Sequence, residues 1–330
     1  GLELLNSLEE LRLDGTSIKQ LERISGLSYL KVLSVVRNGL SSLDFVKGLI
    51  RLEELYVEQG TITDISPLRN LLLLQKLDFQ DHQVVDIAPL ANLSALRDLR
   101  IDWNPIDDIL PLLGLSKLQL LGLGGVSVVD FSSLSQLKGL RWLRLDQNNI
   151  ASFDFILDLP LLNNTGLGTT GMTDQDLELI AQKQWVSLGV GTNQLTTIEP
   201  LANQEGLSFL IISRNEIVDL RPLASLQSLR YLSADDIGVS SLAGLGALSD
   251  LEELRLQSNN IVDISELSGL GNLNFLDLSW NQISDLGDIF DSWAGPTQIN
   301  LSNNPLTCED ISAASQNQSI QITFDSECAV

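Results

Sequence analysis

The feature that most constrains the fold of this 330-residue chain is a leucine that returns every 22 residues along almost its entire length. One step of 23 residues precedes Trp185, and a last step of about one extra residue leads to Ile299 and Leu301. A chain this periodic grows by stacking equivalent turns rather than by building separate cores. The first position of these 14 turns is held in order by Leu8, Leu30, Leu52, Leu74, Leu96, Leu118, Leu140, Leu162, Trp185, Leu207, Leu229, Leu251, Leu273 and the strand with Ile299.

Each turn reads L-x-x-L-x-L-x-x-N-x-I-x-D-I-x-P-L-x-x-L-x-x, and its two halves differ in spacing. The L-x-L alternation predicts a strand with one face in the core and one in solvent. Apolar residues spaced by three, as in Ile65, Leu68, Leu71 and Leu74, indicate a short 3₁₀ turn. Because extended strand takes more axial room than compact helix, we expect an α/β solenoid curved with its parallel β-sheet on the concave face.

The repeat resembles the leucine-rich-repeat superfamily, specifically the 22-residue class of bacterial internalins and of a eukaryotic phosphatase regulator. The strings TDISPLRNL, VDIAPLANL and VDLRPLASL carry this resemblance, which covers nearly all of the chain. It implies a right-handed, horseshoe-shaped solenoid that binds other macromolecules. We therefore expect a partial repeat at residues 1–7, the solenoid at 8–306, and a C-terminal cap at 307–330, with further residues preceding Gly1 in the protein.

The last segment breaks the repeat and resembles the cysteine-closed C-terminal flanks of secreted repeat proteins. It contains the only two cysteines, Cys308 and Cys328. A bridge between them would remove loop entropy worth about 3 kcal/mol and cover the open end of the last turn. That disulfide implies an oxidising compartment. Two reduced structural thiols are the alternative.

The acidic balance of the chain limits its partners. The formal net charge is −23, which argues against nucleic acid, since phosphate binding needs Lys and Arg. It also argues against adsorption to an anionic membrane surface. No apolar run approaches the length that spans a bilayer, the longest leucine string being Leu71 to Leu74.

Two polar columns of the repeat have a structural interpretation. The asparagines at the ninth position are expected to bond backbone groups where the chain leaves the strand. The acidic and hydroxyl residues before the second half are expected to cap the helical turn. The first column comprises Asn38, Asn104, Asn148, Asn193, Asn215, Asn259, Asn281 and Asn304. The second comprises Asp64, Asp86, Asp108, Asp130, Asp219, Asp263 and Asp285, with Ser42, Ser152, Thr197 and Ser241 in the same position.

Neither catalysis nor a metal site is indicated. His82 is the only histidine and stands in the asparagine column, so we expect it to replace Asn structurally rather than to act as a base. Asp78, Asp81, Asp98 and Asp102 crowd neighbouring strands and raise the possibility of Ca²⁺. Arginines are interleaved with them, and solvated ion pairs are the better explanation. We predict no cofactor and no metal.

The candidate binding surface is the concave face, where equivalent side chains of neighbouring strands form columns about 4.8 Å apart. Tyr and Trp on such a surface are typical of interaction hot spots. The aromatic residues expected there are Tyr56, Trp103, Trp142, Phe209, Tyr231, Phe275 and Trp280. The partner-binding residues we predict are Arg100, Asp102, Trp103, Gly122, Gly124, Trp142, Arg144, Asp146, Phe209, Ile211 and Tyr231.

Glycines interrupt the middle strands. They suggest a shallow floor without side chains, with one wall of Trp142, Arg144 and Asp146 and another of Phe209, Ile211 and Tyr231. A smaller hollow is expected over Gly122 and Gly124, flanked by Arg100 with Asp102 and by Arg144 with Asp146. The alternative is that Gly merely relieves crowding on a curved sheet. The glycines are Gly122, Gly124, Gly166, Gly168, Gly189 and Gly191.

These observations favour a non-catalytic scaffold that binds another protein, in a secreted or cell-surface protein used for adhesion or recognition. The expected location is extracellular, periplasmic or the cell surface. One alternative is a glycan or matrix binder that uses Trp103 and Trp142 as stacking platforms. Another is an intracellular regulator that docks on an enzyme, as the phosphatase-binding relative implies. An enzyme is not indicated, because no nucleophile–base pair or phosphate loop is recognisable.

Overall fold

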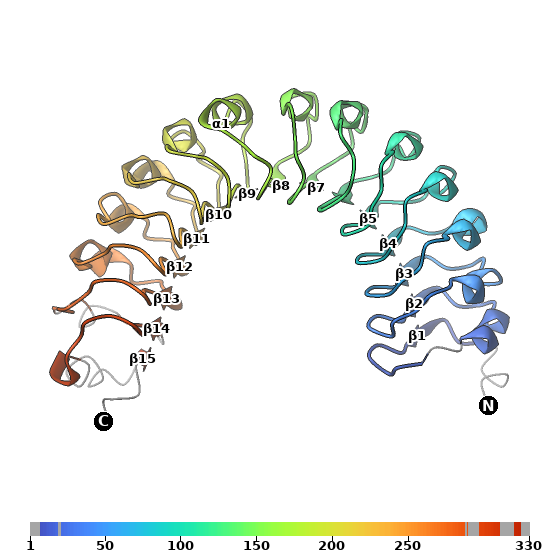
Figure 1. Ribbon diagram of the computed structural model, residues 1–330, viewed down its shortest axis with the longest axis horizontal. Helices are drawn as coiled ribbons and strands as arrows, with labels where there is room; N and C mark the ends of the chain where they lie inside the picture. Colours follow the sequence, from blue (N-terminus) through green and yellow to red (C-terminus); the bar gives the residue numbers. More distant parts are fainter. Residues whose placement is uncertain (1–6, 19–20, 288, 290–296, 311–319, 325–330) are drawn as a thin grey trace. The chain divides into compact units, whose positions relative to one another are not determined.

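The computed structural model describes residues 7–18, 21–287, 289, 297–310 and 320–324. The chain divides into two compact units, residues 1–165 (the N-terminal unit) and 166–330 (the C-terminal unit). In each unit taken by itself, the strands lie on the inner side of the bend and the helices on the outer side (Figure 1). The predicted solenoid of parallel strands and 3₁₀ turns is confirmed.

The N-terminal unit repeats a three-residue strand followed by a 3₁₀ helix. Its strands are β1 Glu10–Arg12, β2 Val32–Ser34, β3 Glu54–Tyr56, β4 Lys76–Asp78, β5 Asp98–Arg100, β6 Leu120–Gly122 and β7 Trp142–Arg144. Its 3₁₀ helices are η2 Glu22–Gly26, η3 Asp44–Val46, η4 Ser66–Asn70, η5 Ala88–Leu90, η6 Leu110–Leu112, η7 Ser132–Gln136 and η8 Asp154–Ile156. Neighbouring strands pair in parallel with a constant 22-residue offset, as in Leu99 with Leu121.

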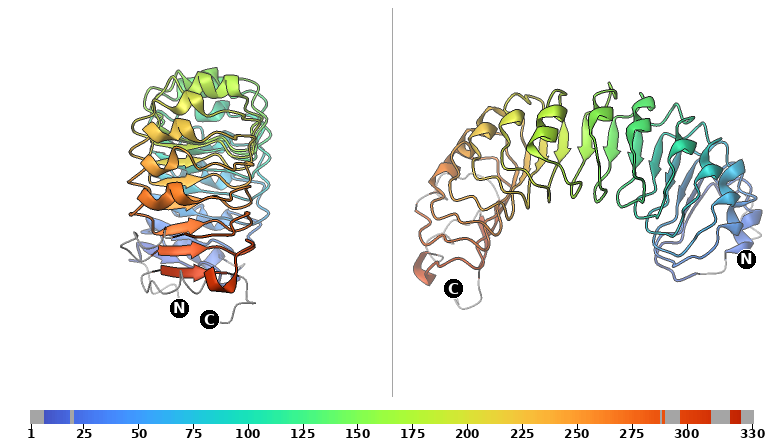
Figure 2. Two further views of the ribbon diagram at one scale, coloured as in Figure 1. Left: turned by 90° about the vertical axis from the view of Figure 1, so that its left-hand side faces the viewer. Right: turned by 45° about the horizontal axis from the view of Figure 1, so that its top comes forward.

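The C-terminal unit is built in the same way. The strand β8, Asn164–Gly166, lies at the division, and the unit continues with β9 Ser187–Gly189, β10 Phe209–Ile211, β11 Tyr231–Ser233, β12 Glu253–Arg255, β13 Phe275–Asp277, β14 Thr297–Asn300 and β15 Ile320–Thr323. The helices are α1 Asp174–Ile180, η9 Glu199–Leu201, η10 Arg221–Ser225, η11 Leu245–Ala247 and η12 Ser265–Gly269. Figure 2 shows the strands of each unit side by side.

The core of each unit is a ladder of aliphatic side chains. Leu96 and Leu99 are fully buried and Ile101 is 3% exposed, and the same positions are buried from the second turn onward, whereas Leu8, Leu11 and Leu13 of the first turn are half-buried. Burying one such side chain stabilises the fold by about 1.5–3 kcal/mol. The repeated leucines therefore account for the recurrence of a strand in every turn and for the face of each strand that packs in the core.

The asparagine column bonds the backbone as predicted. Asn104 donates from Nδ2 to the carbonyl oxygens of Phe79, Ile101 and Asp102 at 2.9, 3.1 and 3.2 Å. Its Oδ1 accepts the Val84 N–H at 3.1 Å. Each amide thus joins two successive turns, because its partners come from both. The other seven asparagines make equivalent bonds.

His82 replaces asparagine, which confirms the structural interpretation of this residue. The ring is 1% exposed and stacks on Phe79 with centroids 4.2 Å apart. Nδ1 accepts the Ile62 N–H at 3.4 Å, and Nε2 donates to the Val57 carbonyl at 3.1 Å. Both nitrogens are occupied by backbone groups, so the ring is not available to a substrate.

The acidic column caps the outer turns as predicted. Asp108 accepts the Leu110 N–H at 2.8 Å. Asp108 stands one residue before Ile109, the N-cap residue of η6. The other residues of this column accept the N–H two positions ahead in the same way. These carboxylates lie on the outer part of each turn and do not belong to the strand surface.

One turn departs from the 3₁₀ pattern. The 23-residue step contains the α-helix α1, whose first turn is closed by Asp176 accepting the Thr173 N–H at 2.9 Å. Trp185, at the leucine position, is 1% exposed and donates its indole N–H to the Ile180 carbonyl at 3.0 Å. The extra residue therefore lengthens the outer segment, and a larger side chain fills the added space.

The expected C-terminal cap is described only in part. β15 pairs in parallel with β14, so one more strand continues the sheet into the segment predicted to break the repeat. Cys308 is described but Cys328 is not, and the predicted Cys308–Cys328 bridge therefore lies outside the described residues. Most of the predicted partial repeat at residues 1–7 also lies outside them.

Candidate binding surface

The strand face of each unit presents side chains in columns, because the strands pair without any slip. In the N-terminal unit Asp98, Leu120 and Trp142 occupy one column. Arg100, Gly122 and Arg144 occupy the next. The predicted placement of Trp142 beside Leu120 is confirmed, and Trp142 is half-buried.

The hollow predicted over Gly122 and Gly124 is filled by the chain itself. The Asp102 carboxylate lies against both glycines, and a Cβ atom on Gly122 would collide with its Oδ2. Oδ1 accepts the Gly124 N–H at 2.7 Å, while Oδ2 makes no hydrogen bond within the described residues. The absence of side chains at these two glycines makes room for the Asp102 carboxylate, and no open hollow is left there.

The environment of Asp102 is desolvated. Only 1% of its side chain is exposed, and burial raises the pKa of the carboxyl, opposed by the Gly124 N–H and by Arg144. Arg144 Nε lies 3.9 Å from Asp102 Oδ1 but 2.9 Å from Asp146 Oδ2, so the arginine pairs chiefly with Asp146. The predicted residues Arg144, Asp146 and Asp102 therefore come together as one charged group.

A second charged group lies on strands β4 and β5. Arg100 is 3.6 Å from both Asp78 and Asp98, and Lys76 is 3.7 Å from Asp98. Burial also raises the pKa of Asp78. Asp78 and Asp98 form ion pairs as expected, but the Asp78 side chain is only 6% exposed and is therefore buried rather than solvated. Within the described residues no group of three or more His, Cys, Asp or Glu side chains is placed to hold a metal ion.

Two aromatic rings of the N-terminal unit, those of Tyr56 and Trp103, contact other residues of the same unit. Lys76 lies 5.0 Å and Arg12 lies 5.9 Å from the centre of the Tyr56 ring. Trp103 has a left-handed backbone with φ of 59°, and its ring lies where a Cβ on Gly125 would stand. Gly125 thus permits the indole to pack onto the next turn.

In the C-terminal unit the predicted pair of Phe209 and Tyr231 is brought together. The two rings stack with centroids 4.2 Å apart and planes inclined by 11°, and both are half-buried. Ile211 is half-buried on the same strand as Phe209. Farther along, Arg255 lies 4.8 Å from the Phe275 ring and pairs with Glu253 at 2.7 Å.

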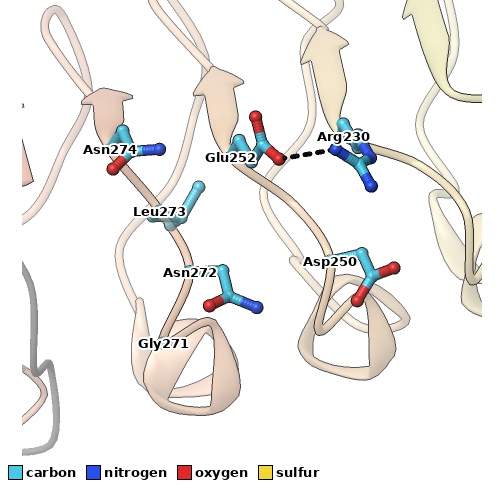
Figure 3. A pocket seen from close by; sticks show the side chains of 7 residues that line it. All are labelled: Arg230, Asp250, Glu252, Gly271, Asn272, Leu273 and Asn274. Carbon is cyan, nitrogen blue, oxygen red and sulfur yellow. Dashed lines mark hydrogen bonds and ion pairs between the residues drawn. The ribbon is translucent and has the colours of Figure 1, made fainter.

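A polar hollow of about 390 Å³ lies beside strands β11, β12 and β13. Arg230 and Glu252 form an ion pair of 3.1 Å within it, and Asp250 stands on the turn below (Figure 3). The sequence did not single out this hollow. The remaining lining residues are Gly271, Asn272, Leu273 and Asn274.

The two units differ in charge. Residues 1–165 contain 15 Lys and Arg against 21 Asp and Glu, a net charge of −6. Residues 166–330 contain 5 Lys and Arg against 22 Asp and Glu, a net charge of −17. The acidity of the chain is therefore concentrated in the C-terminal unit, a signal that was present in the sequence.

The predicted floor would draw one wall from each unit. The structure assembles Trp142, Arg144 and Asp146 in the N-terminal unit and Phe209, Ile211 and Tyr231 in the C-terminal unit. A single floor joining them stays a prediction. In the described part of the chain, no helix has the length and apolar character needed to cross a membrane.

Comparison with known proteins finds its matches among solved structures. No protein-family profile and no curated protein sequence matches the chain. An internalin (InlF) from Listeria monocytogenes is similar at 29% identity and a TM-score of 0.70, over 88% of this chain and 86% of that one.

Two further structures are similar at lower identity. One is a leucine-rich-repeat protein of Leptospira interrogans, at 20% identity and a TM-score of 0.67, over 97% of this chain and 85% of that one. The other is the functional domain of InlJ from Listeria monocytogenes, described as including a cysteine ladder. It is 21% identical with a TM-score of 0.64, over 92% of this chain and 65% of that one. At these identities both show the fold alone.

Proposed function

Since the chain is a leucine-rich-repeat protein, we propose that it is a non-catalytic scaffold that binds another protein through the strand faces of its units. The observation that carries this proposal is the set of half-buried aromatic side chains on those faces, Trp142 in one unit and the Phe209–Tyr231 stack in the other. Such rings give up much surface to a partner at little cost in entropy. Asparagine side chains bond the backbone where the strands that carry these rings end.

The structure offers no support for an enzyme. The only histidine has both ring nitrogens on backbone groups, so it is not poised as a general base. The similar structures from Listeria monocytogenes and Leptospira interrogans have the same fold, and the one at 29% identity is named an internalin. Binding is the activity that this surface supports best.

The test is capture of a partner from the native environment by the whole chain and by two variants, Trp142→Ala and Phe209→Ala/Tyr231→Ala. We expect a protein retained by the unmodified chain to be lost or weakened about tenfold by at least one variant, since aromatic hot spots contribute on this scale. Val129→Ala is the matched control, because Val129 is 83% exposed and away from the strands. Equal retention by all variants would overturn the proposal.

We further propose that the protein is secreted or displayed at a cell surface. The support is the position of both cysteines in the last 23 residues, where a bridge would close the final turn. Titration of thiols in the denatured, unreduced protein should find none. Two free thiols would contradict this location and favour an intracellular regulator.

A further inference from the structure

A row of side chains crosses the strand face of the C-terminal unit. Phe209, Tyr231, Glu253 and Phe275 occupy equivalent positions on strands β10 to β13, each paired directly with the next. Two of the three rings, Phe209 and Tyr231, form the stack. Their remaining surface faces away from the core, because the leucines beside them, Leu210 and Leu232, are fully buried.

Two other rings on the strand faces, Tyr56 and Phe275, already have a cation of this chain over them. Tyr56 has Lys76 and Arg12 within 6 Å of its centre, and Phe275 has Arg255. Among the described residues no lysine or arginine lies over Phe209 or Tyr231. An aromatic face attracts a cation through its quadrupole, and in the C-terminal unit the stack is a place where no described lysine or arginine meets that attraction.

The C-terminal unit has few cations to supply. Of its five Lys and Arg residues, three are engaged by neighbouring carboxylates. These are Arg221 with Asp219, Arg230 with Glu252, and Arg255 with Glu253. A net charge of −17 on the unit favours the approach of a positively charged partner and raises its association rate.

The polar hollow adds a second place for a cation on the same strands. The carboxylates of Asp250 and Glu252 line it, and Arg230 neutralises only Glu252 (Figure 3). Asp250 is exposed and pairs with no cation within the described residues. Asn272 and Asn274 contribute amide oxygens that accept hydrogen bonds from an ammonium or guanidinium group.

We propose that the strand face of the C-terminal unit binds a basic, extended segment of a partner protein. One arginine side chain lies over the Phe209–Tyr231 stack, and a second cation enters the hollow beside Asp250. Arginine suits the first place better than lysine, because its planar guanidinium stacks on aromatic faces. This inference rests on the proposed protein-binding function and adds the chemistry of the partner.

The probe is a fluorescein-labelled, capped hexa-arginine peptide, with binding to the whole chain followed by fluorescence anisotropy. A hexacitrulline peptide of the same shape carries no charge and is the matched control. We expect binding of the arginine peptide at low salt, weakening as salt rises, and none of the citrulline peptide. Equal binding of both peptides, or of neither, would overturn the proposal.

Variants separate the stack from general attraction to an acidic surface. Phe209→Leu/Tyr231→Leu should weaken arginine-peptide binding about tenfold, and Asp250→Asn about threefold, while Tyr56→Leu in the N-terminal unit should leave it unchanged. Tyr231→Phe keeps the ring and should retain the affinity. Full binding by the double leucine variant would mean that the peptide is held by charge alone, against the proposal.

A readout on the unmodified protein does not depend on any variant folding. Protons of the arginine side chain that lie over stacked rings shift upfield in a proton NMR spectrum, and we expect that shift for the bound peptide. Its absence would contradict the placement on the stack. If the peptide fails but a native partner is still lost with Phe209 and Tyr231, the cationic chemistry is wrong and the protein-binding function stands.

Discussion

The N-terminal and C-terminal units have the same repeat, the same backbone bonds and different surfaces. On the N-terminal strand face several carboxylates have a basic neighbour, as with Asp98 and Arg100 or Asp146 and Arg144. In the C-terminal unit acids exceed bases, and among the described residues no lysine or arginine lies over the Phe209–Tyr231 stack. The comparison shows that the repeat determines the positions of the surface side chains but not their charge or chemical type.

The strongest test of the shared backbone is to remove one asparagine from each unit. Asn104→Ala and Asn259→Ala each delete three donated bonds and leave buried carbonyls and N–H groups unpaired. We expect each to lower the free energy of unfolding by about 3 kcal/mol, measured by urea denaturation. A large difference between the two losses of unfolding free energy would contradict the claim that both units depend equally on the asparagine column.

The next test concerns a glycine that the N-terminal surface requires. Gly122→Ala places a Cβ against Asp102 Oδ2 and should lower the free energy of unfolding by about 2 kcal/mol. Adding Asp102→Ala should restore part of that loss. Gly206→Ala in the C-terminal unit is the control, since its Cβ would meet only the Trp185 carbonyl at 3.8 Å. Equal effects at both glycines would contradict the filled hollow.

His82 should differ from the asparagines of both units in a smaller effect, the dependence of the free energy of unfolding on pH. Burial lowers the pKa of His82 below its ordinary value of 6.5. The unfolded chain then binds the proton more readily, so the stabilisation is complete above pH 6.5 and is lost as pH falls through the lowered pKa. His82→Asn should not lose stability in that window. Parallel curves of unfolding free energy against pH for the two proteins would refute this.

The smallest expected effect distinguishes the exposed Trp280 from the half-buried Trp103. Trp280→Ala, in the C-terminal unit, should change the free energy of unfolding by less than about 0.5 kcal/mol, because its side chain is exposed. Trp103→Ala should cost more, since its ring packs on Gly125 of the next turn. Thermal unfolding of both variants checks this order, and the reverse order would show that Trp280 packs within the fold.

The sequence predicted the architecture well because the same spacing is repeated many times. Leucine alternation located the strands, and the two columns that contain Asn104 and Asp108 specified how each turn is closed. The helix α1 was not predicted, because one inserted residue only hints at a longer outer segment. The continuation of the sheet into β15 was not predicted either, since Ile320–Thr323 lacks the leucine pattern.

The candidate surface was predictable in position but not in detail. Column membership placed Phe209 beside Tyr231, and the structure stacks them. The glycines at 122 and 124 were expected to leave an open hollow, but sequence spacing does not reveal which way the Asp102 side chain turns. The excess of acid in the C-terminal unit is written in the sequence, yet a whole-chain charge of −23 conceals how unevenly it is divided.

In the 23-residue turn the outer segment changes in length while the strand keeps its register. The strand bonds continue across this turn, because the Leu167 N–H donates to the Gly189 carbonyl at 2.7 Å. The Val190 N–H makes the equivalent bond to the Ile211 carbonyl in the next turn at 2.8 Å. An inserted residue has therefore been absorbed entirely by the outer segment. Loops and helices on that side can be exchanged during evolution, or grafted by an engineer, while the order of side chains presented on the inner rows is preserved.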